Sequence, residues 1–71
     1  MNAVIHIYQN KVTRIEREFE TLAQACGTAK KLLRNTPFHW CYAHVFYLDS
    51  GTKRRVEIRK GEKWIVKDEV L

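Results

Sequence analysis

Hydrophobic and polar residues alternate at the start of the chain, in two runs separated by a short polar segment. The first run covers residues 3–8, which are rich in Val and Ile, and the second covers residues 12–19. Alternation with a period of two is typical of a β-strand, and a short polar break between two such runs is typical of a hairpin. The pattern therefore predicts an amino-terminal hairpin in which Ile15, Arg17 and Phe19 share one side of the second strand.

The hydrophobic period changes to that of a helix after residue 20. Thr21 and Gln24 have the spacing of a capping box, in which a hydroxyl and an amide side chain bind free backbone groups at a helix start. Pro37 disfavours a helical conformation in the residue before it, so we expect residues 35–37 to end the helix. The apolar side of this predicted helix consists of Leu22, Ala25 or Cys26, Ala29, Leu32 and Leu33.

The strongest strand pattern in the sequence covers residues 38–48. Turn-forming residues at 49–52 and 60–62 then separate two further expected strands, over residues 53–59 and 63–70. Because side chains alternate across a strand, residues 38–48 have two different faces. One face consists of Phe38, Trp40, Tyr42, His44, Phe46 and Leu48, and the other consists of His39, Cys41, Ala43, Val45 and Tyr47.

These elements predict a single α+β domain over residues 1–71, in the order β-β-α-β-β-β. We expect an antiparallel sheet of about five strands with one helix packed on one face. The helix side that meets the sheet is rich in Ala and Cys, which leaves room for large side chains, so we expect the aromatic face of residues 38–48 to be buried. The opposite face would then expose His39 and Tyr47 beside the arginines of residues 53–59.

Charge and composition narrow the classes of partner. The chain has 71 residues, a net charge of +5 and a pI near 9.5, which favours nucleic acid as partner, then an acidic protein, then a membrane surface. No apolar run approaches the ~20 residues that cross a bilayer, and the amino terminus lacks the features of a secretory signal. Cys26 and Cys41 are too few for a disulfide scaffold, so we expect reduced, buried thiols and a cytoplasmic location.

The basic residues form two groups in the sequence. Lys30, Lys31 and Arg34 lie at the end of the predicted helix, where cations also interact favourably with the helix dipole. Lys53, Arg55 and Arg59 share one face of an expected strand, where a solvated sheet face is the simpler interpretation. Both groups remain candidates for binding nucleic-acid phosphates.

Catalytic and metal-binding patterns are missing from the sequence. His39 and Cys41 share a face of the expected strand, but His44 is on the other face, and no Cys-x-x-Cys or His-x-x-x-His pair occurs. There is also no glycine-rich phosphate loop and no nucleophile elbow. The run of residues 38–42 is rich in aromatics that could stack on bases, but a small sheet needs such side chains for its core. We therefore expect a binding protein with no cofactor and no small-molecule substrate.

Several segments, taken in order, resemble a known family. An amino-terminal hairpin is followed by a helix ending Ala29-Lys30-Lys31-Leu32, by Arg34-Asn35, and by a long strand that begins Phe38-His39. A closing hairpin carries the run Lys60-Gly61-Glu62-Lys63-Trp64-Ile65-Val66. In these features the chain resembles small phage-encoded anti-CRISPR proteins, in particular inhibitors of the type I-F Cascade surveillance complex.

The resemblance implies a function in the cytoplasm of a bacterial host. The protein would bind the backbone Cas subunits that hold the guide RNA, block hybridisation of target DNA to that guide, and hold double-stranded DNA non-specifically. Two alternatives remain open: a phage nucleic-acid-binding accessory protein with no protein target, and an inhibitor of another bacterial defence or host protein. The candidate partner-binding residues are Asn35, Phe38, His39 and Tyr47, and the candidate nucleic-acid-binding residues are Lys30, Lys31, Arg34, Lys53, Arg55 and Arg59.

Overall fold

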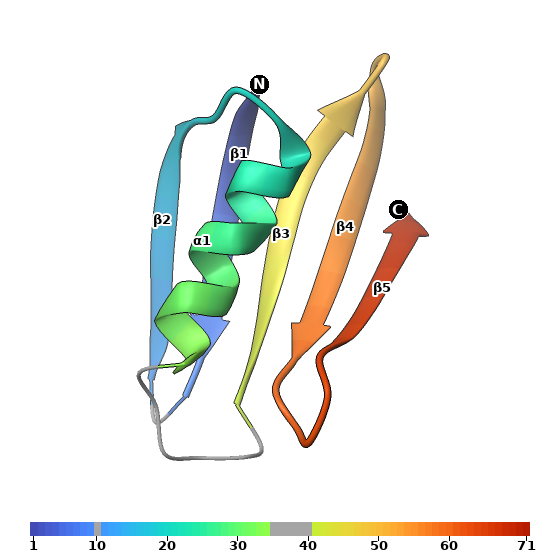
Figure 1. Cartoon of the computed structure of the whole chain (residues 1–71). Helices are drawn as coiled ribbons and strands as arrows, with labels where there is room; N and C mark the ends of the chain where they lie inside the picture. The colour runs from blue at the N-terminus through green and yellow to red at the C-terminus, as the bar shows by residue number, and fades with distance from the viewer. Residues whose placement is uncertain (10, 35–40) are drawn as a thin grey trace.

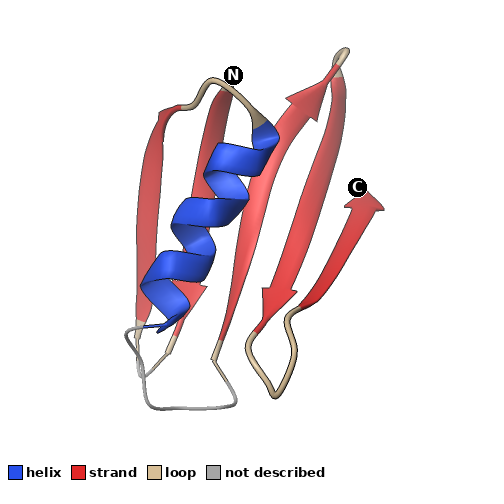
Figure 2. Ribbon diagram, viewed as in Figure 1, coloured by secondary structure: helices blue, strands red, loops and turns tan. Residues whose placement is uncertain are grey.

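The computed structural model describes residues 1–9, 11–34 and 41–71. Its five strands form one antiparallel sheet in the order β2-β1-β3-β4-β5, and the single helix of the described residues lies on one face of that sheet (Figures 1 and 2). This confirms the predicted α+β class and the predicted order of elements. The elements are β1 (Asn2–Tyr8), β2 (Val12–Glu18), α1 (Leu22–Arg34), β3 (Tyr42–Asp49), β4 (Thr52–Arg59) and β5 (Ile65–Val70).

The capping-box prediction at the start of α1 is confirmed for one of its two hydrogen bonds. The backbone N–H of Gln24 donates to Oγ1 of Thr21 at 3.2 Å, and the Gln24 side-chain oxygen accepts from the backbone N–H of Glu20 at 3.0 Å. The first bond satisfies a donor that a helix start otherwise leaves without an intrahelical partner, whereas the second binds the residue before Thr21 and not the backbone N–H of Thr21. The sequence therefore specified where the helix begins.

A tight turn joins β3 to β4. Ser50 and Gly51, the two residues between these strands, have φ values of 50° and 84°. Two consecutive residues with positive φ match the right-handed twist of a hairpin, and glycine adopts such a conformation without steric cost. The turn keeps β3 and β4 in a register that places Val45 opposite Val56.

The core lies between α1 and the sheet. The helix presents Ala25, Ala29 and Leu33 to β1, β3 and β4, and all three are fully buried. The sheet contributes alternate residues, of which Ile5, Val45 and Ile58 are fully buried. The helical side predicted from the sequence is thus the side that packs. Within the described residues, no helix has the length and apolar character needed to cross a bilayer.

The predicted burial of the aromatic face of β3 is wrong. Cys41, Ala43 and Val45 face the helix and are buried, whereas Tyr42 and His44 are on the sheet face opposite α1. The small residues of α1 do not leave room for large partners on the sheet. They are buried together with small and branched sheet residues, whereas Tyr42, His44 and Phe46 lie on the other face.

Candidate functional site

The sheet face opposite α1 carries a group of aromatic, histidine and charged side chains. We call it the open sheet face, because α1 covers only the other side (Figure 1). The strand register brings its central members together: His6 lies opposite His44, and Tyr8 opposite Tyr42. On the far side of β3, Tyr42 lies opposite Arg59. The open sheet face consists of His6 and Tyr8 from β1, Tyr42, His44 and Phe46 from β3, and Arg55, Glu57 and Arg59 from β4.

Ring contacts connect the members of the open sheet face. Tyr8 and Tyr42 stack with their centroids 4.6 Å apart and their planes 17° apart. The guanidinium carbon of Arg59 lies 4.6 Å from the Tyr42 centroid, which is the geometry of a cation–π contact. His44 makes edge contacts with Tyr8 and Phe46, at centroid distances of 5.1 and 5.8 Å. The rings therefore hold one another in a fixed arrangement on a half-exposed surface.

Carboxylates neutralise the arginines of the open sheet face. Glu57 accepts from His44 Nε2 at 3.1 Å and from Arg59 Nε at 3.2 Å. The hydrogen bonds from His44 and then from Arg59 lower the pKa of the Glu57 carboxyl below its ordinary value. Arg55 Nη2 donates to Glu69 at 3.2 Å. This face combines aromatic rings with paired charges, so it has no strong net charge of its own.

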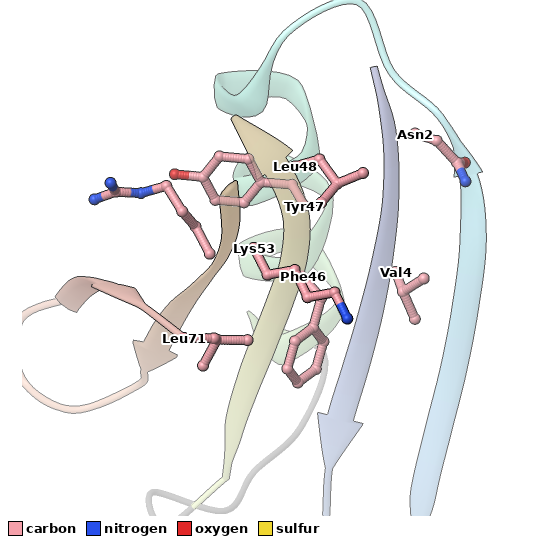
Figure 3. Close-up of a pocket in the computed structure, with 8 residues that line it drawn as sticks. Asn2, Val4, Phe46, Tyr47, Leu48, Lys53 and Leu71 are labelled. Atoms are coloured by element: carbon pink, nitrogen blue, oxygen red, sulfur yellow. The ribbon is translucent and has the colours of Figure 1, made fainter. Parts of the chain in front are cut away.

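One end of the open sheet face forms a shallow apolar pocket of about 320 Å³. Its walls include Val4 from β1, Phe46 and Leu48 from β3, and Leu71 after β5 (Figure 3). Lys53 contributes to the rim. Leu48 and Leu71 are 62% and 57% exposed, so this end of the face presents apolar surface to solvent. Together with the rings it makes a continuous surface suited to a protein partner.

A second, basic surface lies at the C-terminal end of α1, on the other side of the sheet. Lys30 Nζ and the Arg34 guanidinium carbon each lie 5.9 Å from the centre of the Trp64 ring. Lys60 Nζ donates to the carbonyl oxygens of Leu33 at 3.3 Å and Arg34 at 3.5 Å. We call Lys30, Lys31, Arg34 and Lys60 the helix-end cluster.

The helix-end cluster differs from the open sheet face in how its charges are paired. In the described part of the chain, no carboxylate forms an ion pair with Lys30, Lys31 or Arg34. Lys31 and Arg34 are exposed at the helix end. Lysine and arginine side chains beside a half-buried tryptophan form a surface that attracts phosphate groups without base specificity.

The structure divides the predicted nucleic-acid-binding residues between two faces. Lys30, Lys31 and Arg34 belong to the helix-end cluster, while Lys53, Arg55 and Arg59 are on the open sheet face, so the six do not form one patch. Arg55 and Arg59 are also paired with Glu69 and Glu57.

Of the predicted partner-binding residues, only Tyr47 lies within the described part of the chain. Asn35, Phe38 and His39 lie outside the described residues. Tyr47 is on the helix side of β3, where its hydroxyl donates to Asp68 at 2.9 Å beside Arg54. Burial and the Asp68 hydrogen bond raise the pKa of the Tyr47 hydroxyl. The expectation that Tyr47 lies on an exposed sheet face is therefore wrong, because Tyr47 shares the face of Cys41, Ala43 and Val45, and that face meets the helix.

Metal ligation and thiol chemistry find little support in the described residues. Among them, no group of three or more His, Cys, Asp or Glu side chains is arranged to hold a metal ion. Cys41 and His44 occupy opposite faces of the sheet, as the alternation predicts. Neither Cys26 nor Cys41 forms a disulfide, and burial raises the pKa of the Cys26 thiol, which makes it a weaker nucleophile.

The open sheet face was not predicted from the sequence, although the sequence contains a signal for it. In β1 the alternation places Ala3, Ile5 and Ile7 on one face and His6 and Tyr8 on the other. A face with a histidine and a tyrosine is less suited to a dry core than a face of Ala and Ile. Since β1 and β3 are neighbours, that preference also decides the orientation of Tyr42 and His44. The patterns of the two strands, taken together, therefore indicate this surface.

No protein family model, curated protein or solved structure matches this chain.

Proposed function

We propose that this protein is an anti-CRISPR inhibitor that binds the backbone Cas subunits of a type I surveillance complex and blocks target DNA from pairing with the guide RNA. The observation that carries the proposal is the separation of two unlike surfaces. A charge-paired aromatic face lies on one side of the sheet, and on the other side lies a basic cluster in which Lys30, Lys31 and Arg34 have no carboxylate partner among the described residues. The sequence resemblance supplies the class of target.

The open sheet face suits a protein partner better than a nucleic acid. Tyrosine and arginine are the residue types that most often dominate the energetics of protein interfaces. A channel that holds a guide–target duplex is itself positively charged, so a basic inhibitor needs a docking surface that the channel does not repel. The open sheet face fits this requirement, because Glu69 and Glu57 neutralise its Arg55 and Arg59.

The helix-end cluster suits DNA. Its cations are oriented by Trp64 and by the end of α1, and three of them have no carboxylate partner within the described residues. Contacts of this kind bind phosphates of any sequence and weaken as salt increases. In the proposed complex the open sheet face binds Cas subunits, while the helix-end cluster holds DNA away from the guide.

The test is a mobility shift at physiological salt with labelled target duplex and the purified type I-F surveillance complex, with and without this protein. Premixing should abolish guide-dependent strand opening, while this protein alone should shift little DNA. The combined change Tyr42→Ala and Phe46→Ala should abolish inhibition by removing the docking rings. The combined change Lys30→Gln, Lys31→Gln and Arg34→Gln should remove any sequence-independent DNA retention by the inhibited complex and weaken inhibition.

The matched control is Lys11→Gln with Arg17→Gln, which removes positive charges from the β1–β2 hairpin at an exposed turn position and on the sheet face opposite the open one. It should inhibit like the wild type. Strand opening that continues normally in the presence of the wild-type protein would reject the proposal. If the helix-end variant still inhibited fully and retained DNA, the DNA-binding role of the helix-end cluster would be rejected, but the docking role of the open sheet face would not.

One observation favours a second candidate, a nucleic-acid-binding accessory protein. The stacked Tyr8 and Tyr42 rings, with Arg59 over Tyr42, resemble the combination of aromatic and guanidinium groups on which single-stranded bases stack. In that case the protein alone would bind single-stranded DNA, Tyr42→Ala would reduce the affinity, and the surveillance complex would work normally in its presence. Fluorescence anisotropy at two salt concentrations separates this candidate from the first.

A further inference from the structure

The edge strand β5 leaves apolar side chains in solvent. It is the last strand of the sheet, and no strand of the described residues pairs with its outer edge (Figure 1). Ile65, Val66, Val70 and the following Leu71 are 50–60% exposed. At the other edge, β2 exposes mainly charged side chains, which is a common protection against edge pairing. The β5 edge is therefore better suited than the β2 edge to pairing with a strand of another chain.

The backbone of β5 presents three residues to the free edge. In an antiparallel pair, residues whose N–H and C=O groups face one neighbour alternate with residues that face the opposite side. The N–H of Leu71 donates to the carbonyl oxygen of Lys53 at 2.9 Å, so the backbone N–H and C=O groups of Leu71 point toward β4. By alternation Ile65, Lys67 and Glu69 also face β4, and the backbone groups of Val66, Asp68 and Val70 point outward.

Residues 65–71 are complementary to themselves when two copies run antiparallel. Their sequence, Ile-Val-Lys-Asp-Glu-Val-Leu, is centred on Asp68. Around that centre an aliphatic residue meets an aliphatic residue at the outer positions, and Lys67 meets Glu69 at the inner ones. Cross-strand pairs of these kinds stabilise an antiparallel sheet.

We propose that two copies of this chain associate through their β5 edges, antiparallel and centred on Asp68. Val66 then lies opposite the partner's Val70, Lys67 opposite the partner's Glu69, and Ile65 opposite the partner's Leu71. The outward-facing residues Val66, Asp68 and Val70 are the ones that must exchange hydrogen bonds in this register, so the backbone and the side chains agree. The proposal is independent of the function proposed above.

The local contacts also fit the centre of this register. The two Asp68 residues lie opposite each other, which would be unfavourable for bare carboxylates. Each Asp68 carboxylate, however, already accepts from Tyr47 at 2.9 Å and from Arg54 at 3.2 Å in its own chain. On the open sheet face, Lys67 lies opposite Glu57 in its own sheet and would meet the partner's Glu69 on the other side. Positive and negative side chains thus alternate across the interface.

Other registers that preserve the same hydrogen bonds are worse. A shift by two residues places Lys67 opposite the partner's Lys67, or Glu69 opposite the partner's Glu69, and like charges directly opposite are destabilising. In the proposed register the two sheets join into one, with both helices on the same side. The two open sheet faces become continuous, so the dimer presents each binding surface twice.

Sedimentation equilibrium of the full chain tests the proposal. An edge of seven residues is smaller than a standard interface, so we expect a dimer with a Kd on the order of 100 µM, measurable between about 10 µM and about 1 mM. Lys67→Glu and Glu69→Lys should each raise the Kd about tenfold, because two attractive pairs become repulsive. Mixing the two variants should restore association as a heterodimer. The control Lys11→Glu makes the same charge change at an exposed position in the β1–β2 turn and should leave the Kd unchanged.

Amide hydrogen exchange identifies the edge directly. Exchange at Val66, Asp68 and Val70 should slow as protein concentration increases, while the amides of β2 should not respond. A chain that stays monomeric up to about 1 mM would overturn the proposal, since the expected Kd lies well below that concentration. A dimer that protects β2, or that ignores both charge changes and their mixture, would overturn it as well. Circular dichroism spectra of each variant distinguish loss of pairing from loss of folding.

Discussion

The side-chain nitrogen of Lys60, in the turn after β4, lies 3.3 Å from the carbonyl oxygen of Leu33 in the last turn of α1. The two residues are 27 positions apart in the sequence. The last carbonyls of a helix have no intrahelical donor, so a lysine from another element satisfies them and also opposes the negative end of the helix dipole. This contact ties the β4–β5 turn to the helix-end cluster.

Replacing Lys60 by methionine should therefore destabilise the fold. Lys60→Met retains most of the aliphatic chain but removes the charge and the donor. We expect the free energy of unfolding to fall by about 0.5–1 kcal/mol, measured by urea denaturation. Lys63→Met is the control, because Lys63 is exposed and no described contact holds it to α1. An equal effect of both changes would contradict the capping role of Lys60.

Leu33 should be among the most sensitive positions of the core. Its side chain is fully buried between α1 and the sheet, so Leu33→Ala removes buried methyl groups and leaves a cavity. Such changes cost about 2–5 kcal/mol, which is comparable to the whole stability of a domain of this size, about 3–5 kcal/mol. We expect Leu33→Ala to be largely unfolded by circular dichroism at 25 °C. Leu48→Ala, at a position 62% exposed, should change stability by less than about 0.5 kcal/mol.

Thr21 should contribute to stability through its hydroxyl group. In Thr21→Ala the backbone N–H of Gln24 loses the acceptor that it has at 3.2 Å. We expect a loss of about 1 kcal/mol in thermal or chemical unfolding. Thr21→Ser retains the hydroxyl and should remain close to the wild type. If Thr21→Ser were as destabilising as Thr21→Ala, the methyl group and not the cap would be responsible.

Glu57 should make stability depend on pH in the acid range. Its folded-state pKa lies below the ordinary value of 4.5 because His44 and Arg59 hydrogen-bond to the ionised carboxylate. A lowered pKa means that the ionised group stabilises the folded state. That contribution is complete above the unfolded-state pKa and is lost as pH falls through the folded-state value. The stability difference between wild type and Glu57→Gln should therefore shrink as pH falls from about 6 to about 3.

Urea titrations at several pH values measure this difference. The matched control is Glu62→Gln, which removes a carboxylate from an exposed position in the β4–β5 turn. A difference between wild type and Glu57→Gln that stayed constant over this pH range would show that the contacts of Glu57 with His44 and Arg59 do not depend on its charge.

The sequence was sufficient for features that depend on neighbouring residues. The capping pair Thr21 and Gln24 located the start of α1, and the alternation in β1 and β4 located two strands to within a residue. These features are local, because a hydrogen bond three residues away or a period of two needs no other part of the chain. The same alternation also separated the two faces of β3 correctly.

The choice between those faces was made only by the tertiary structure. Alternation says which residues of β3 share a side, but not which side meets α1, and the aromatic face was the wrong choice. The joint burial of Ala25 and Ala29 of α1 with Ala43 and Val45 of β3 decided it, because a close-packed interior is filled by side chains whose volumes fit together.

The grouping of the charges was also a tertiary outcome. Lys30 and Arg59 both contribute to the net positive charge of the chain, yet they lie on opposite sides of the sheet. Glu57 forms an ion pair with Arg59 and not with Lys30. The sequence by itself determined the elements, their order and the positive charge. Which charges are paired and which edge is free was decided only by the strand order and by the side of the sheet that α1 covers. The strand order and the position of α1 depend on contacts between residues distant in the chain, so the sequence pattern does not reveal them.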